Sequence, residues 1–148
     1  MMIISLKELL TENIQNTAFV SFIKEQMIDL YGELTESSDI KNNIFLQIIQ
    51  YNPIFIEIDE RSVIRGTITL ILEQKMYRGG KFVAHIEDLV VHKGFRKMGI
   101  ASKLISYAKD FAKTQGCYKV ILNCKDELVP VYEKSGFTQK NVEMSLYF

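Results

Sequence analysis

A short basic turn near the middle of the chain has the residue types of an anion-binding site. Residues 96–101 (Arg-Lys-Met-Gly-Ile-Ala) follow an alternating apolar run and open a helical apolar pattern. The first N–H groups of a helix have no partner within the helix, and the helix dipole adds partial positive charge there. Gly99 and Ala101 leave the backbone accessible, while Arg96 and Lys97 add charge. The turn therefore suits a phosphate, although alone it also fits an ordinary strand–helix connection.

Acid and base chemistry is available from three further side chains. Glu87 and Asp88 are adjacent near the end of the apolar run. On a regular strand their carboxylates point to opposite faces, so both serve one site only if the strand is distorted or one acts through its backbone. The phenol of Tyr132, with an ordinary pKa of about 10, stays protonated at neutral pH and can donate a proton. Taken alone, the acidic pair also fits a solvated turn, and Tyr132 a core position.

Several strings along the chain resemble those of a known enzyme family. Arg-x-x-Gly-x-Ala after a strand is similar to the pyrophosphate-binding signature of the GCN5-related N-acetyltransferase (GNAT) superfamily. More specifically, the chain resembles the eukaryotic-type glucosamine 6-phosphate N-acetyltransferases. The matching strings, which extend over most of the chain, are Leu34-Thr35, Gln50-Tyr51-Asn52-Pro53, His85-Ile86-Glu87-Asp88-Leu89-Val90-Val91, Gly116-Cys117-Tyr118-Lys119-Val120 and Tyr132-Glu133-Lys134-Ser135-Gly136-Phe137.

The resemblance implies a fold and a reaction. The fold is α/β, a single GNAT domain over residues 1–148 with a mixed, mostly antiparallel central sheet flanked by helices. The reaction transfers the acetyl group of acetyl-CoA to the amine of D-glucosamine 6-phosphate by direct attack of the amine on the thioester. It uses no metal and belongs to UDP-N-acetylglucosamine biosynthesis. The family also implies a homodimer whose sites are shared between subunits.

The resemblance places the cofactor-binding residues in two segments and adds Tyr132. Backbone N–H groups at a strand bulge around Leu89, Val90 and Val91 polarise the acetyl carbonyl, and in other enzymes loss of one such donor costs about 3 kcal/mol. Tyr132 lies near the thioester sulfur and protonates the departing thiolate. The pyrophosphate is bound by Arg96, Lys97, Met98, Gly99, Ile100, Ala101 and Ser102.

The acceptor site is also assigned by the resemblance. Glu87 and Asn123 join Tyr132 as catalytic residues. Lys75 and Arg78 suit the sugar phosphate, and Tyr118 and Lys119 reach the partner's sugar site. The complete set expected to bind the amino sugar is Leu34, Thr35, Lys75, Arg78, Glu87, Asp88, Tyr118 and Lys119.

Three positions depart from the family pattern. Asn123 stands where relatives often carry an acid, and an amide can orient an amine but cannot take its proton. The base is then Glu87, Asp88 or a water, unless the amine arrives neutral.

The other two departures affect binding. Leu128 replaces an asparagine of many superfamily members, which removes a polar contact to the cofactor. Tyr147 replaces an arginine that reaches across a dimer to the sugar phosphate. Candidates to compensate for that arginine are Lys119, Lys140 and Arg78.

The elements that hold these residues follow from apolar periodicity and turn residues. Helical spacing predicts one helix over 16–34 and a second from Ser38 or Asp39 through Gln50. Later helices are expected over 100–115, ending at Gly116, and over 130–135, ending at Gly136. Strands are predicted at 54–59, 63–73, 82–91, 118–124 and 137–148.

Composition limits the classes of protein and partner. The 148 residues suffice for one domain with a substantial core. Eighteen basic residues balance eighteen acidic ones, so no net charge attracts nucleic acid or an anionic membrane. The longest apolar runs are too short to span a membrane, and the first residues lack a signal-like pattern. We therefore expect a cytoplasmic protein.

The cysteines and histidines are expected to be structural. With only two of each, Cys117 and Cys124 predict neither a disulfide nor a metal site, and fit buried thiols on or beside a strand. His85 is expected to bond backbone or pack at its strand, and His92 to be exposed.

Two alternatives stay open at this point. One is a GNAT enzyme that acetylates another amine, such as a polyamine, an aminoglycoside or a protein N-terminus, which Tyr147 favours. The other is a non-catalytic acyl-CoA-binding subunit, which Asn123 and Leu128 favour.

Overall fold

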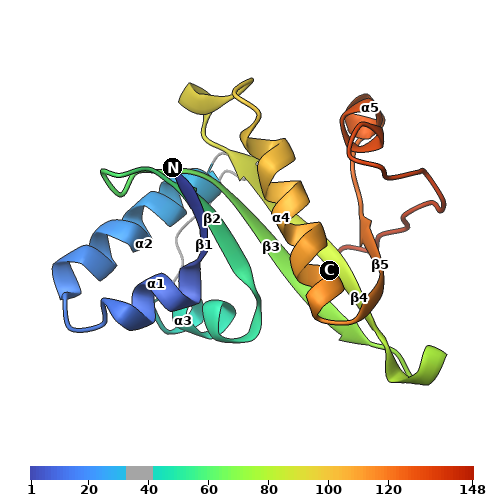
Figure 1. The fold of residues 1–148 in the computed structure, drawn as a ribbon, viewed down its shortest axis with the longest axis horizontal. Coiled ribbons are helices and arrows are strands. Elements are labelled where there is room, and N and C mark those ends of the chain that lie inside the picture. Colours follow the sequence, from blue (N-terminus) through green and yellow to red (C-terminus); the bar gives the residue numbers. More distant parts are fainter. Residues whose placement is uncertain (33–41) are drawn as a thin grey trace.

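Apolar, largely β-branched segments form a mixed sheet at the centre of the molecule. The computed structural model describes residues 1–32 and 42–148. In these residues the strands are β1 (Met2–Ser5), β2 (Ile54–Ile58), β3 (Ile64–Gln74), β4 (Phe82–Val91) and β5 (Cys117–Leu122). They lie in sequence order; the pairs from β1 to β4 are antiparallel, and β5 runs parallel to β4. The predicted mixed, mostly antiparallel sheet is confirmed (Figure 1).

Helices cover both faces of the sheet. Helices α1 (Leu6–Glu12), α2 (Thr17–Gly32) and α3 (Asn42–Tyr51) share one apolar core, and α4 (Ile100–Thr114) packs into a second (Figure 1). Strand β2 shows how side-chain alternation separates the two cores. Ile54, Ile56 and Ile58 join the core of the first three helices, whereas Phe55 joins that of α4.

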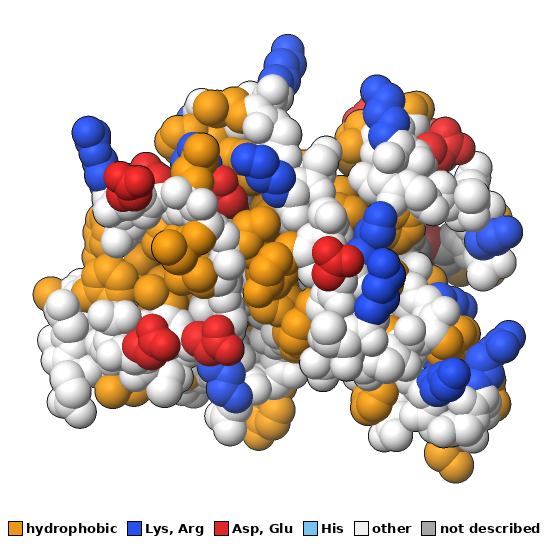
Figure 2. Space-filling model, viewed as in Figure 1, with side chains coloured by type: hydrophobic (Ala, Val, Ile, Leu, Met, Phe, Trp, Pro, Cys, Tyr) orange, Lys and Arg blue, Asp and Glu red, His pale blue; other side chains and the backbone are white. Residues whose placement is uncertain are grey.

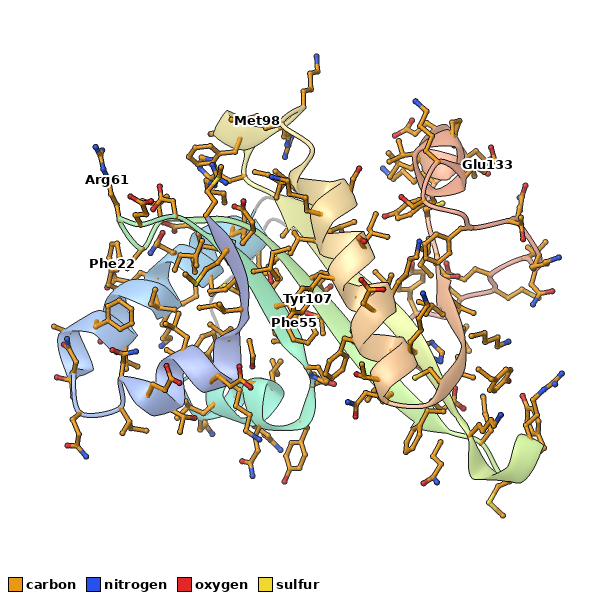
Figure 3. All side chains as sticks on the ribbon, viewed as in Figure 1. Phe22, Phe55, Arg61, Met98, Tyr107 and Glu133 are labelled. Carbon is orange, nitrogen blue, oxygen red and sulfur yellow. The ribbon has the colours of Figure 1, made fainter. Side chains whose placement is uncertain are left out.

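Helix α4 buries the apolar stripe that its sequence predicts. Figure 3 shows Phe55 and Tyr107 next to each other where α4 crosses the sheet, and their ring centroids are 4.9 Å apart. The helix ends as predicted before Gly116, whose φ of 71° is in the left-handed region that favours glycine. Its buried residues are Ile100, Leu104, Ile105, Ala108 and Ala112.

Short helical segments complete the described fold. The 3-10 turns are η1 (Arg78–Gly80), η2 (Lys93–Phe95) and η3 (Asp126–Leu128), and η3 leads into α5 (Val129–Glu133). Pro130 lies in the first turn of α5, where its missing N–H costs no helical hydrogen bond. Among the described residues, no helix combines the length and the apolar character needed to cross a membrane.

Most of the predicted elements are present. The helix predicted at 16–34 is α2, where Asn16 Oδ1 accepts a hydrogen bond from the Phe19 N–H at 3.1 Å. The second predicted helix is α3, although Ser38 and Asp39 lie outside the described residues. The strands predicted at 54–59, 63–73, 82–91 and 118–124 match β2 to β5 within two residues.

The sequence prediction failed at both ends of the chain. Residues 137–148 form neither helix nor strand, so the predicted last strand is wrong for the single chain. Strand β1 and helix α1 were not predicted. The missed signal for α1 is Ser5-Leu6-Lys7-Glu8, a capping-box pattern, and the Ser5 hydroxyl does accept from the Glu8 N–H at 3.3 Å.

We predict that Leu104→Ala lowers the free energy of unfolding by about 3 kcal/mol, because it leaves a cavity where a fully buried side chain joins α4 to the sheet. Urea denaturation measures the change. The exposed Lys103→Ala, one residue away on the same helix, is the control and should change stability by less than about 0.5 kcal/mol. Equal losses for both variants would contradict the assigned packing of α4.

Candidate active site

A cleft opens where β5 stops pairing with β4. The parallel pairing ends at Ile86 and Leu122, after which β4 continues beside β3 alone and the chain beyond β5 leads to η3 and α5. The resulting cavity has a volume of about 380 Å³. We call it the β4–β5 cleft; it is lined by residues 86–89 and 122–125 with Glu127, Leu128 and Tyr132.

A bulge in β4 shapes one wall of the cleft. Thr69 pairs with Glu87 and Thr67 with Val90, so Asp88 and Leu89 face a single residue of β3. Asp88 has a φ of 49°, a left-handed conformation that is sterically costly for a residue with a side chain. A bulge leaves an extra residue outside the regular ladder, which makes backbone groups available to a ligand.

The bulge also resolves the orientation of the acidic pair. Glu87 and Asp88 both line the cleft, although adjacent residues on a regular strand point to opposite faces. Glu87 is half-buried, and Asp88 is exposed overall while partial desolvation raises the pKa of its carboxyl. The distortion of β4 therefore lies at Glu87 and Asp88, where it is needed for two adjacent acidic residues to line one site.

Tyr132 lines the opposite wall of the cleft. It is half-buried on α5, and its ring meets that of Phe137 edge-on at 6.1 Å. Burial raises the pKa of the Tyr132 phenol, and the neighbouring Cys124 thiol adds to the rise. Asn123 and Leu128 line the same cleft and are exposed. The cleft therefore brings together a proton donor, two carboxylates and one amide.

The basic turn lies between the end of β4 and the start of α4. We call residues 96–99 the basic loop; all four are exposed, and Lys97 and Gly99 have φ values of 64° and 77°. A Cβ on Gly99 would meet nothing within 4 Å, so the loop is open to a ligand on that side. In Figure 3, Met98 of the loop and Glu133 of α5 both lie at the upper edge of the molecule. The residues present fit an anionic ligand at the start of α4.

The prediction that His92 is exposed needs correction. His92 is half-buried: its Nδ1 accepts from the Gly94 N–H at 3.1 Å, within η2. His85 is half-buried on β4, which agrees with the expected packing at its strand, and its Nε2 lies 2.9 Å from Glu73 Oε2. Neither imidazole is among the residues that line the β4–β5 cleft.

The cysteine prediction is right for one residue only. Cys117 is half-buried on β5, and burial raises the pKa of its thiol. Cys124 is exposed beside the cleft, so its prediction as a buried thiol is wrong. Both thiols are free, and the described residues hold no group of three or more metal-ligating side chains.

Four of the predicted substrate residues lie away from the cleft, at the other end of β4. Lys75 forms an ion pair with Glu73, and the guanidinium of Arg78 lies 5.0 Å from the Tyr118 ring centroid, with Lys119 on the same ring at 5.7 Å. We call Lys75, Arg78, Tyr118 and Lys119 the hairpin cluster. Figure 2 shows basic side chains gathered at this end of the molecule.

The hairpin cluster is separated from the acidic pair within one chain. Gln74 pairs with Phe82 and Lys119 with Val83, so Glu87 is five and four residues further along β4, which corresponds to roughly 17 and 13 Å at strand spacing. The single chain therefore separates these cations from Glu87 and Asp88. Leu34 and Thr35 lie outside the described residues.

A polar side chain that the sequence did not predict for the site lies beside the bulge. The Tyr31 phenol on α2 lies beside Thr67, Thr69 and Asp88, and burial raises its pKa. The Thr69 hydroxyl is buried, and the Tyr31 phenol is a polar group beside it. The available signal was the alternation of Thr67 and Thr69 in an otherwise apolar strand, which directs two hydroxyls to one face.

The fold and this cleft define an acyltransferase of the GNAT class. The model of the acetyltransferase (GNAT) family matches residues 14–137, and the chain belongs to this family. Members use acetyl-CoA as cosubstrate.

Within this family, the chain is similar to proteins named as glucosamine 6-phosphate N-acetyltransferases. A probable glucosamine 6-phosphate N-acetyltransferase 2 of Oryza sativa is 44% identical over 87 residues, which cover 59% of this chain and 52% of the rice protein. The glucosamine 6-phosphate N-acetyltransferase of Arabidopsis thaliana is 33% identical over 87% of this chain and 92% of its own. Its crystal structure matches with a TM-score of 0.79 and 34% identity, covering 85% of this chain and 92% of that chain.

We predict that Tyr132→Phe keeps acetyl-CoA binding but lowers kcat by about 10² to 10³, because the ring packing on Phe137 survives while the proton donor is lost. Since the phenol pKa is raised, activity that depends on the protonated phenol should persist to pH values above its ordinary pKa of about 10. Thiol release is followed against pH, and cofactor binding by calorimetry. The exposed Val131→Ala on the same helix serves as control. Unchanged turnover in the Phe variant would remove Tyr132 from the mechanism.

Proposed function

We propose that the chain transfers the acetyl group of acetyl-CoA to the amine of D-glucosamine 6-phosphate, giving N-acetyl-D-glucosamine 6-phosphate and CoA. The observation that carries the proposal is the β4–β5 cleft, in which Glu87, Asp88 and Tyr132 face one cavity beside a strand bulge. The named relatives supply the acceptor, because the Arabidopsis enzyme aligns over nearly its whole length. On this proposal, residues 1–148 act as one catalytic domain.

Two segments of the chain hold the donor in this proposal. The basic loop and the first turn of α4, through Ser102, bind the pyrophosphate by backbone N–H groups and by the charge of Arg96 and Lys97. Bound acetyl-CoA supplies an activated acyl group as a thioester. The backbone at Leu89, Val90 and Val91, next to the bulge, donates to the acetyl carbonyl and stabilises the charge that develops on its oxygen.

Proton transfers are assigned to the residues on the two cleft walls. The amine nitrogen attacks the carbonyl carbon, the carbon–sulfur bond breaks, and the departing sulfur takes a proton from Tyr132. Glu87 or Asp88 accepts the proton that the amine loses. Asn123, an amide, orients the amine or the leaving thiol and takes no proton.

The sugar phosphate requires cations that the cleft of one chain does not provide. The hairpin cluster, with Lys75 and Arg78, lies roughly 13 to 17 Å from Glu87 along the sheet. We therefore propose a homodimer in which the hairpin cluster of one subunit completes the cleft of the other. Leu34 and Thr35 are proposed to line the acceptor site from the end of α2.

The last residues of the chain support a dimer. Val142, Met144, Leu146 and Phe148 are almost fully exposed, at 78% or more, and alternate with other residues as the side chains of a half-buried strand do. In the described residues, β5 is an edge strand with one side unpaired. We propose that residues 138–148 become a strand only against the sheet of a second copy.

The cellular setting is part of the same proposal. Two free thiols suit a reducing compartment, which supports a cytoplasmic enzyme. Its product would supply UDP-N-acetylglucosamine biosynthesis. Balanced charge supports neither nucleic acid nor a membrane as partner.

An acceptor assay tests the proposed reaction. Purified protein with acetyl-CoA is offered glucosamine 6-phosphate, glucosamine, spermidine and a short peptide, and thiol release is recorded. We expect kcat/KM for glucosamine 6-phosphate to exceed that for glucosamine by 10-fold or more, because the phosphate is bound by cations. Turnover with the polyamine or the peptide alone would overturn the proposed acceptor. Acetyl-CoA binding without any turnover would indicate the non-catalytic subunit.

A tail variant tests the dimer. Met144→Asp with Leu146→Asp should shift the protein from dimer to monomer in sedimentation at micromolar concentration, because two charges then enter an apolar interface. The matched control is Glu143→Gln with Ser145→Ala, on the alternate positions of the same segment. A wild-type monomer, or a dimer unaffected by the aspartates, would contradict the proposed role of the tail.

A further inference from the structure

A buried ion pair joins the ends of β2 and β3. The side chains of Glu57 and Arg65 are 2% and 8% exposed, and Arg65 Nε donates to Glu57 Oε2 at 2.7 Å. The pairing shifts from Ile58–Ile64 to Glu57–Gly66, so Arg65 is the extra residue of a β-bulge. A bulge of this kind turns two neighbouring side chains toward the same face, which explains how Arg65 reaches Glu57.

Burial of this pair needs a reason other than stability. Removing two charges from water costs about as much as their attraction returns, and apolar residues of similar volume often stabilise as well or better. Arg65 stays charged, because its bond to Glu57 raises the pKa of the guanidinium.

Arg65 holds the turn that leads into the basic loop. Its guanidinium carbon lies 5.4 Å from the ring centroid of Phe95, a cation–π contact within the buried layer. Its backbone carbonyl accepts the His92 N–H at 2.9 Å. The same guanidinium also contacts the Met1 sulfur. Both the backbone and the side chain of one residue thus fix η2, directly before Arg96.

Gly66 fixes the other end of the basic loop. A Cβ there would lie 3.0 Å from Ile100 Cγ2 and 3.1 Å from Leu104 Cδ1, so a larger residue would push these side chains at the start of α4 away from β3 by a few tenths of an ångström. Two consecutive residues of β3 therefore contact the two ends of the basic loop: Arg65 contacts the turn before it, and Gly66 contacts the helix start after it. Its own four residues are exposed, and two of them have positive φ.

We propose that the Glu57–Arg65 pair is a positioning device for the basic loop, which places the loop and the first turn of α4 to receive the pyrophosphate of CoA. Glu57 orients the guanidinium, the guanidinium holds Phe95, and η2 then sets where the loop begins. Arg65 is a positioning residue and does not touch the ligand. The inference rests on the proposed use of acetyl-CoA and is independent of the acceptor amine.

Two ligands separate positioning of the loop from general stability. CoA carries the pyrophosphate and the 3′-phosphoadenosine attached to it, whereas pantetheine is the same thiol arm without either. We expect Arg65→Met to raise the dissociation constant of CoA about 10-fold and that of pantetheine less than 2-fold. NMR titration of the folded protein measures both dissociation constants, because the method also detects binding in the millimolar range.

Milder substitutions test the ion pair and the cation–π contact separately. Glu57→Gln keeps the shape but loses the charge, and Phe95→Leu keeps an apolar side chain but loses the cation–π contact. Each should raise the CoA constant by 3-fold or more and leave the pantetheine constant unchanged; Arg65→Lys should fall between Arg65→Met and the wild type. If Arg65→Met does not fold, Phe95→Leu carries the test.

A core control excludes a stability effect. Ile23→Ala lies in the other core, on α2, and destabilises the protein without touching η2. It should change neither constant at a temperature where the protein is folded. Equal weakening of CoA and pantetheine by Arg65→Met, or no weakening of CoA by Phe95→Leu, would overturn the inference. A wild-type protein that does not bind CoA would instead overturn the proposed function.

Discussion

The early end of the pairing between β4 and β5 is the constraint on which the site depends. Because the two strands pair only as far as Ile86 and Leu122, the cleft has one wall held in the sheet by β3 and another built from the segment after β5. The bulge at Asp88 lies just beyond the last β4–β5 pair, and both Glu87 and Asp88 line the opening. A β5 that paired further along β4 would fill this space with backbone hydrogen bonds.

The two faces of the sheet contribute different side chains to the surroundings of the cleft. On the side of α2, the Tyr31 phenol and the Thr69 hydroxyl lie beside the bulge and form a polar surface near Asp88. On the side of α4, two consecutive residues of β3 connect the sheet to η2 and to the helix start. The basic loop and the acidic pair thus depend on different side chains of the same strand.

Local patterns predicted what depends on local interactions. The stripe of α4, the limits of β4 and the glycine after the helix follow from spacing and conformational preference, and all were predicted. The strand predicted for 137–148 failed because alternation shows that a segment can pair, but not that a partner is present in the same chain. The Glu57–Arg65 pair escaped prediction because a shift in register creates it. The separation of Lys75 from Glu87 depends on the length of β4 in three dimensions.

Helix α4 joins two distant parts of the molecule as one rigid body. Its 15 residues span roughly 22 Å, from the basic loop to Gly116, which leads directly into β5 and Tyr118. Near one end, Ile100 and Leu104 pack closely against Gly66 of β3. At the other end the chain enters β5, so the length of α4 sets the spacing between the basic loop and the Tyr118 ring on which Arg78 and Lys119 stack.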